Sequence, residues 1–189
     1  MKTIQCIAIV AVAVATLISC GGSISNQPAN ADGFSAIAKE IENKFGEHAH
    51  FTNITIMHNK SIGNTISLTV TEAPESLKMG QWNFVNASWE QNSEITVEIP
   101  EGTKAADFMF QLNEKINLKK LGELTEQSCK RLTTEKDIKN PTLKMAFVKF
   151  PKNGDNSKTE YVVTLEPENG GTSFTFYYKL NGDFINMNY

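Results

Sequence analysis

Residues 174–189 constrain the fold most strongly, because apolar and polar side chains alternate there on both sides of an Asn-Gly pair. Asn181-Gly182 is typical of a two-residue type I′ turn, which closes an antiparallel hairpin. That turn pairs Phe176 with Met187 and Tyr178 with Ile185. We therefore expect one dry and one wet face, as in an antiparallel sheet covered on a single side. The dry face is predicted to bury Phe174, Phe176, Tyr178, Leu180, Ile185 and Met187, and the wet face to expose Lys179, Asn186 and Asn188.

Period-two alternation recurs earlier in the chain and predicts further strands. It is clear in residues 54–56, 66–70, 143–147 and 161–165. Asn86-Ala87 predicts the turn of another hairpin, in which Phe84 lies opposite Trp89. The same face is then expected to continue through Ile95, Val97 and Ile99. Residues 106–112 also alternate, and they fit either a further strand or the start of a helix.

Two segments follow the period of an amphipathic helix. Asp32 is predicted to cap the first helix, which runs to about Phe45 and ends at Gly46. Asn117 is predicted to cap the second helix, which runs to about Leu132. The inner stripe of the second helix is expected to consist of Leu118, Leu121, Leu124, Thr125, Ser128 and Leu132.

The two halves of the sequence resemble each other in order. Residues 67–74 end in Glu-Ala-Pro and residues 161–167 end in Glu-Pro, and each stretch precedes a predicted hairpin. We therefore predict an α+β fold of tandem repeats, in which each helix packs on one face of its own antiparallel sheet or of a shared continuous sheet. The first repeat is predicted to span residues 33–102 and the second residues 103–189.

This layout resembles that of the β-lactamase-inhibitor-protein-like group and of the related PepSY-like periplasmic lipoproteins. The resemblance covers most of residues 33–189 in the order of elements. It implies a binding or inhibitory role, often on a protein partner, and no cofactor.

The first twenty residues are typical of an export signal. Lys2 gives a short positive start, and residues 4–18 are almost all apolar. This run is short of the roughly 20 residues that a membrane-spanning helix needs. The ending Leu17-Ile18-Ser19-Cys20 resembles the lipobox of bacterial lipoproteins, which implies cleavage between Ser19 and Cys20 and acylation of Cys20. An ordinary secretory signal is the alternative.

The lipobox resemblance also implies a location. Gly21, not Asp, follows the cysteine, which favours the outer over the inner membrane. No acidic cluster follows, so we expect the protein to face the periplasm. Residues 1–19 are then the signal peptide, and the small, polar residues 20–32 are predicted to be a flexible tether.

Charge and cysteine content exclude some classes of protein. The chain has 18 basic and 21 acidic residues, a net charge of −3. Removal of residues 1–19 takes away Lys2 and no acid, and the resulting charge of −4 argues against nucleic acid as a partner. Because Cys6 would leave with the signal peptide and Cys20 would be acylated, Cys129 has no partner for an intrachain disulfide. We expect it to be a small buried residue on a helix, with a reactive thiol as the alternative.

No motif for catalysis, a metal or a cofactor is recognisable in the sequence. His48, His50 and His58 lack a convergent set of further ligands, and we expect them to be solvated. Residues 153–157 contain Asp155 as their only acid, so they fit a turn better than a calcium loop.

Two aromatic residues give the remaining indication of function. The predicted hairpin register places Tyr177 and Phe184 on the wet face, where aromatic side chains can anchor a partner. Partial cover by loops is the alternative. We therefore expect a membrane-anchored, non-catalytic binding or inhibitory module of the cell envelope, with an envelope protein as its candidate partner. An envelope enzyme with a dispersed site and a structural subunit of an envelope complex are the rival hypotheses.

Overall fold

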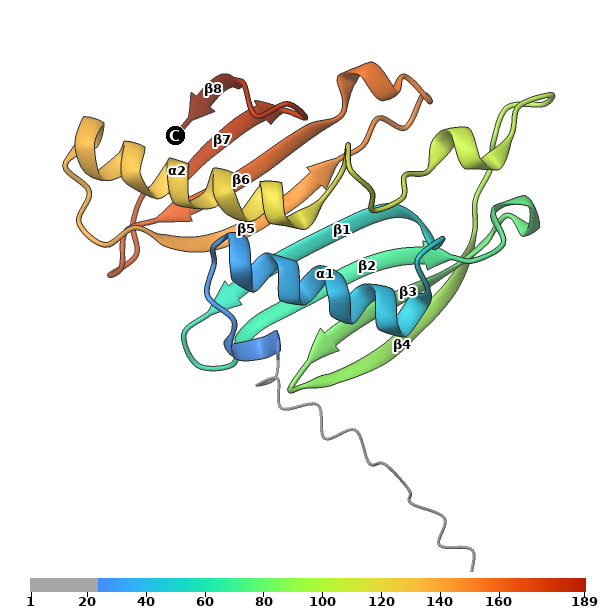
Figure 1. Cartoon of the computed structure of the whole chain (residues 1–189), viewed down its shortest axis with the longest axis horizontal. Coiled ribbons are helices and arrows are strands. Elements are labelled where there is room, and N and C mark those ends of the chain that lie inside the picture. The colour runs from blue at the N-terminus through green and yellow to red at the C-terminus, as the bar shows by residue number, and fades with distance from the viewer. Residues whose placement is uncertain (1–23) are drawn as a thin grey trace, which may run out of the picture.

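The computed structural model describes residues 24–189, in which each α-helix is followed by four strands (Figure 1). The first part of the chain forms α1 (Ala31–Phe45), β1 (His50–Asn59), β2 (Gly63–Thr71), β3 (Lys78–Val85) and β4 (Ser88–Thr96). The second part forms α2 (Leu118–Lys136), β5 (Thr142–Lys149), β6 (Glu160–Glu166), β7 (Phe174–Lys179) and β8 (Phe184–Asn188). Short 3-10 helices are η1 (Ile24–Asn26), η2 (Pro74–Ser76), η3 (Ala105–Phe108) and η4 (Asn156–Lys158).

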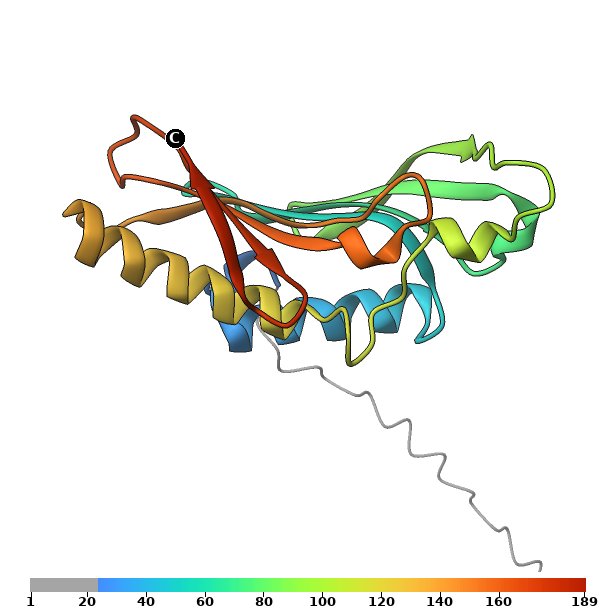
Figure 2. The same cartoon turned by 90° about the horizontal axis from the view of Figure 1, so that it is seen from above.

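All eight strands join one antiparallel sheet in the order β4-β3-β2-β1-β5-β6-β7-β8. β1 and β5 meet at its centre, where Thr55, Ile56 and Met57 pair with Phe147, Ala146 and Met145. Both α-helices lie on the same face (Figure 2). The predicted α+β class is therefore confirmed, and within residues 24–189 the opposite face carries no α-helix.

Each α-helix begins at an asparagine. The Asn117 side chain accepts a hydrogen bond from the Lys120 backbone N–H at 2.7 Å, as the sequence predicts. The cap of α1 is Asn30, which accepts from the Gly33 N–H at 2.9 Å, so the prediction of Asp32 was wrong. Gly46 ends α1 as expected, with a φ of 87° that favours glycine. The second helix continues to Lys136, about one turn beyond the predicted end.

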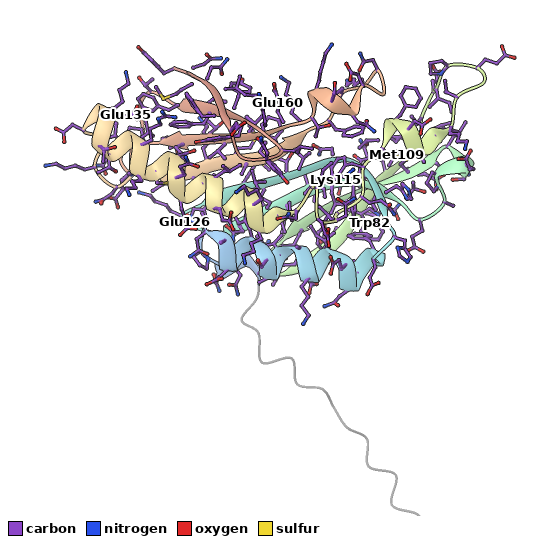
Figure 3. All side chains as sticks on the ribbon, turned by 45° about the horizontal axis from the view of Figure 1, so that its top comes forward. Trp82, Met109, Lys115, Glu126, Glu135 and Glu160 are labelled. Carbon is purple, nitrogen blue, oxygen red and sulfur yellow. The ribbon has the colours of Figure 1, made fainter. Side chains whose placement is uncertain are left out.

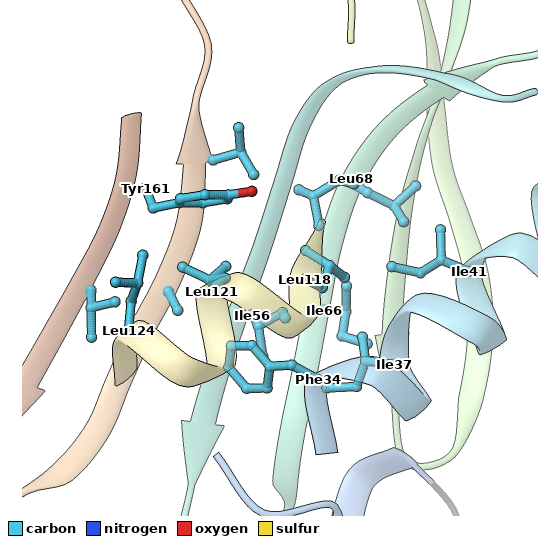
Figure 4. Close-up of a cluster of buried hydrophobic side chains, with 14 of the residues drawn as sticks. Phe34, Ile37, Ile41, Ile56, Ile66, Leu68, Leu118, Leu121, Leu124 and Tyr161 are labelled. Atoms are coloured by element: carbon cyan, nitrogen blue, oxygen red, sulfur yellow. The ribbon is translucent and has the colours of Figure 1, made fainter. Parts of the chain in front are cut away.

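The main core lies between the two helices and the sheet (Figure 4). All six residues of the predicted inner stripe of α2 are buried. Tyr161 and Tyr178 fix this helix to the sheet through their hydroxyls. The Tyr161 hydroxyl oxygen accepts from the Asn117 N–H at 2.8 Å, and that of Tyr178 lies 2.7 Å from Ser128 Oγ. Burial raises the pKa of both phenols, so both remain protonated hydrogen-bonding groups.

The two helices touch each other because Gly122 leaves no side chain between them. A Cβ at this position would collide with the carbonyl oxygen of Asn30 and lie too close to Cα of Ala31. Beside this contact, the Ala31 N–H donates to Glu126 Oε2 at 3.2 Å (Figure 3). The carboxylate of α2 thus also satisfies a free N–H group at the start of α1.

A β-bulge at Asn92 changes the predicted facing of β4. Phe84 pairs with Trp89 as expected, but the pairs then shift from Trp82–Gln91 to Gln81–Ser93. Ile95 therefore lies opposite Met79, on the other face of the sheet from Trp89. The prediction that Ile95, Val97 and Ile99 continue the face of Trp89 was wrong. These three residues pack in a second, smaller cluster with Met79, Ala105 and Met109.

A second bulge makes the register of the C-terminal hairpin differ from the predicted register. Phe176 pairs with Met187 as predicted, but Tyr178 pairs with Phe184 because Ile185 is the extra residue. Ile185 is consequently exposed, and its predicted burial was wrong. Phe174, Phe176 and Tyr178 are buried, whereas Leu180 and Met187 are only partly buried. Lys179, Asn186 and Asn188 are exposed as predicted.

Residues 106–112 form neither of the expected elements. η3 ends at Phe108, and Phe110 then makes a single antiparallel bridge to Phe51 at the start of β1. The rings of Phe51 and Phe110 lie 5.9 Å apart, so this crossing segment contributes an aromatic contact to the core.

Part of the predicted tether packs on the domain. Ile24 and Ser25 are buried, and Asn64 of β2 is fully buried beneath them. The Asn64 amide donates to the carbonyl oxygens of Ile24 at 3.0 Å and Gln27 at 2.7 Å. The packed part of the chain therefore includes residues 24–32 as well as residues 33–189, and the predictions for residues 1–23 lie outside the described residues.

We expect Gly122→Val to lower the free energy of unfolding by about 1–3 kcal/mol, because the added side chain forces α1 and α2 apart. Gln127→Val, at an exposed position of the same helix, is the matched control and should cost no more than about 0.5 kcal/mol. Urea unfolding followed by circular dichroism measures both. Equal stability of the two variants would contradict the close approach of the helices.

Candidate functional site

An apolar stripe crosses the sheet face that the helices leave open. One row of paired residues runs from Phe147 on β5 through Val162 on β6 to Tyr177 on β7. The next row brings Met57 of β1 beside Met145 of β5. We name these five residues the apolar stripe. Val162 is fully buried beneath its neighbours, Met57 is 39% exposed, and the other three side chains are half-buried.

A bulge at Lys144 turns this part of β5 toward the open face. Leu143 pairs with Leu165 and faces the core, whereas Met145 pairs with Thr164 because Lys144 is the extra residue. Without the bulge, Met145 and Phe147 would share the buried face of Leu143. Sequence alternation alone therefore indicated strand β5 but could not place these two side chains on the open face.

The other half of the open face is polar but bears few charges. Thr55, Ser67 and Asn83 continue the row of Phe147 across β1, β2 and β3. Their hydroxyl and amide groups offer hydrogen bonds beside the apolar stripe. The open face thus combines an apolar area with a neighbouring polar area, a combination common at protein interaction sites.

Lysines border the apolar stripe at the end of the strands. Lys149, Glu160 and Lys179 form one cross-strand row on β5, β6 and β7. Lys149 Nζ lies 2.8 Å from Glu160 Oε2 and 5.4 Å from the centre of the Tyr177 ring. This ammonium therefore contributes both an ion pair and a cation–π contact at the border of the stripe.

A cleft of about 880 Å³ opens beyond this row, between residues 149–160 and the β7–β8 hairpin. Lys149, Lys152, Lys158 and Lys179 line it, and Glu160 is the only acidic residue among its lining residues. Lys158 pairs with nearby Asp155 at 3.3 Å, whereas Lys152 and Lys179 have no carboxylate within 4.0 Å among residues 24–189. The cleft is thus locally positive on a chain of net negative charge, which favours anionic groups.

The partly exposed Asp155 belongs to a turn rather than a metal site. Hydrogen bonds from Ser157 and then Lys158 hold the pKa of its carboxyl below the ordinary value. Its Oδ1 accepts from the Ser157 N–H at 3.3 Å, as in the Asx turn that the sequence suggests. Asp155 thus holds the short helix η4 in place at the rim of the cleft.

The structure does not bring Tyr177 and Phe184 together. Tyr177 lies on the open face, but the bulge at Ile185 places Phe184 beside Tyr178 on the helix face. The Phe184 ring is 5.7 Å from that of Tyr178, and the Arg131 guanidinium of α2 lies 3.9 Å from its centre. Of the two predicted binding residues, only Tyr177 belongs to the apolar stripe.

Cys129 is in an environment that keeps its thiol protonated. Its Sγ lies 3.8 Å from the Pro141 carbonyl oxygen, and the residue is only partly accessible. Burial, and then the charge of Glu126, raise the pKa of the thiol from 9.0 to about 11. Because the thiolate is the nucleophile, the structure favours the predicted packing role over a reactive thiol.

Each of the three histidines has different surroundings. His58 Nδ1 lies 2.9 Å from Asn64 Oδ1, which helps to orient the amide that binds the N-terminal segment. His48 is exposed after α1, as predicted. The prediction of a solvated ring was wrong for His50, which begins β1 with a buried Nδ1 that has no hydrogen-bond partner. In the part of the chain that the structure describes, no three His, Cys, Asp or Glu side chains gather as a metal site would require.

Comparisons of the chain with protein-family models, curated proteins and solved structures gave no match. Among residues 24–189, neither α-helix has the length and apolar character needed to cross a bilayer. Ser19 and Cys20, the predicted cleavage and lipidation residues, lie outside the described residues.

Proposed function

We propose that this protein is a non-catalytic binding or inhibitory module of the cell envelope, which engages an envelope protein through its open sheet face. The observation that supports this most is the apolar stripe beside the lysine-lined cleft. Apolar surface left uncovered on a folded domain is typical of an interaction site. Phe147 and Tyr177 are the aromatic anchors of this surface, and the buried Val162 provides a fixed floor between them.

A tandem repeat accounts for the shape of this face. Strand order runs outward from the centre in each half, β1 to β4 on one side and β5 to β8 on the other. The positions of the β-bulges support a correspondence between the two halves. The first strand of each half has a bulge, at Thr52 in β1 and Lys144 in β5. The last strand of each half also has one, at Asn92 in β4 and Ile185 in β8. Two copies of a helix-plus-four-strand unit, joined at β1 and β5, would place both helices on one face.

The lipid anchor remains part of the proposal through Cys20. We propose that Cys20 is acylated in the outer membrane and that the domain faces the periplasm. Only Gly21, Gly22 and Ser23 would then separate the lipid from the buried Ile24. The four steps from Cys20 to Ile24 span at most about 14 Å, so the anchor would hold the β1–β2 turn close to the membrane. Ile62 in that turn is 45% exposed, and the adjacent Gly63 packs against Ser25.

We expect Cys20→Ala to release the protein from the membrane fraction or to block its processing, because two or more acyl chains are needed for durable anchoring. Cell fractionation and intact-mass measurement test this. A mature chain that carries an unmodified Cys20, or that still contains Cys6, would contradict the lipoprotein assignment without affecting the binding face.

The binding face can be tested by photo-crosslinking in intact cells. A benzophenone amino acid in place of Phe147 should give a discrete crosslinked adduct, because that position borders the exposed part of the stripe. The same amino acid in place of Glu42, which is exposed on α1, is the control and should give none. Equal adducts at both positions, or none at Phe147, would contradict binding through the open face.

A further inference from the structure

β8 is an edge strand of the sheet, and its protections against pairing are its short length and the bulge at Ile185. It follows only β7 in the strand order, so its other side faces no strand within residues 24–189. Its five residues, Phe-Ile-Asn-Met-Asn, contain no charge and no proline, two further features that block strand addition. The opposite edge, β4, carries Glu90 and Glu94, and Lys78 pairs with Glu94 at 3.3 Å.

Exposed apolar side chains gather along this edge. Phe184, Ile185 and Tyr189 are 39%, 40% and 75% exposed, and they are three of the five exposed large hydrophobic residues in the described part of the chain. Ile185 also lines the lysine-bearing cleft. The β8 edge therefore offers apolar contacts as well as free backbone groups.

Basic side chains flank β8 on both faces of the sheet. On the helix face, the Arg131 guanidinium lies 3.9 Å from the centre of the Phe184 ring and Lys136 Nζ lies 4.8 Å from that of Tyr189. On the open face, Lys179 ends the neighbouring strand β7 and lines the cleft. Side chains of an added strand alternate between the two faces, so both sets of cations would be within reach of one extended segment.

The nearby carboxylates leave part of this positive charge free. Glu135 pairs with Arg131 at 2.8 Å, and Asp183 accepts a hydrogen bond from the Asn181 side chain at 2.9 Å. Lys136 and Lys179 have no carboxylate within 4.0 Å among residues 24–189. An acidic segment would supply the missing partners, whereas a basic segment would be repelled.

We propose that β8 binds an extended, acidic segment of a protein partner, which adds to the sheet as a further antiparallel or parallel strand. Backbone hydrogen bonds to the free edge supply affinity, and acidic side chains on both faces supply specificity. About five residues, or roughly 17 Å of extended chain, would match the length of β8. This inference goes beyond the open-face binding proposed above because it uses the strand edge, and the two surfaces share only Lys179 and the adjoining cleft.

The test uses the purified protein and a fluorescein-labelled peptide that repeats Glu-Glu-Val-Thr, which places acids on both faces of a strand. Fluorescence anisotropy should show binding that weakens as salt is raised. The same repeat with Lys in place of Glu should not bind. Two further peptides carry N-methyl groups on the odd-numbered or on the even-numbered amides. Each lacks the hydrogen-bond donors of one peptide edge, so one of the two peptides should bind about tenfold more weakly.

Protein variants separate the edge from the open face. Lys179→Glu and Lys136→Glu should each weaken peptide binding by about fivefold or more. Lys39→Glu, an equal charge change at an exposed position of α1, is the control and should change it by less than about twofold. Phe147→Ser on the open face should leave peptide binding intact, so failure of either proposal is distinguishable from failure of the other.

Three outcomes would overturn the proposal. The first is equal binding of the acidic and basic peptides, and the second is full binding by both N-methylated forms. The third is concentration-dependent self-association in sedimentation that Lys179→Glu abolishes, which would show that a second copy of the chain occupies β8.

Discussion

The close contact between α1 and α2 is the constraint on which the rest of the structure depends. Gly122 lets α2 approach the start of α1, and Glu126 accepts a hydrogen bond from the Ala31 N–H at the same place. Two helices in contact must lie on the same side of the sheet. One face therefore carries the main core. The other face carries the smaller cluster around Met79, and its remaining area displays whatever the strands turn toward it.

Bulges decide what that free face displays. A single extra residue reverses the facing of all side chains beyond it. The bulge at Lys144 turns Met145 and Phe147 outward, and the bulge at Ile185 turns Phe184 toward α2. The apolar stripe is thus a product of backbone irregularity as much as of residue choice.

Local signals predicted much of the fold. The Asn117 cap, the inner stripe of α2 and the Asn86-Ala87 turn follow from side-chain chemistry within a few residues, and the structure confirms them. Strand facing beyond a bulge could not be predicted, because regular alternation continues in the sequence where the pairing shifts. The failed prediction for Ile95 and the separation of Tyr177 from Phe184 share that cause. The lysine-lined cleft lies between segments about 30 residues apart in the sequence. Periodicity within either segment cannot indicate that the two lie side by side.

Methionine methyl groups test most directly the central claim that the face of the apolar stripe is open to solvent, because Met57 and Met145 lie on that face. In protein labelled with ¹³C-methyl methionine, a soluble paramagnetic gadolinium chelate broadens each methyl signal according to its access to solvent. The account predicts strong broadening for Met57, intermediate broadening for Met145, and protection for Met79 and Met109, which are buried. Protection of Met145 equal to that of Met79 would contradict the account, because the proposed binding face would then be covered.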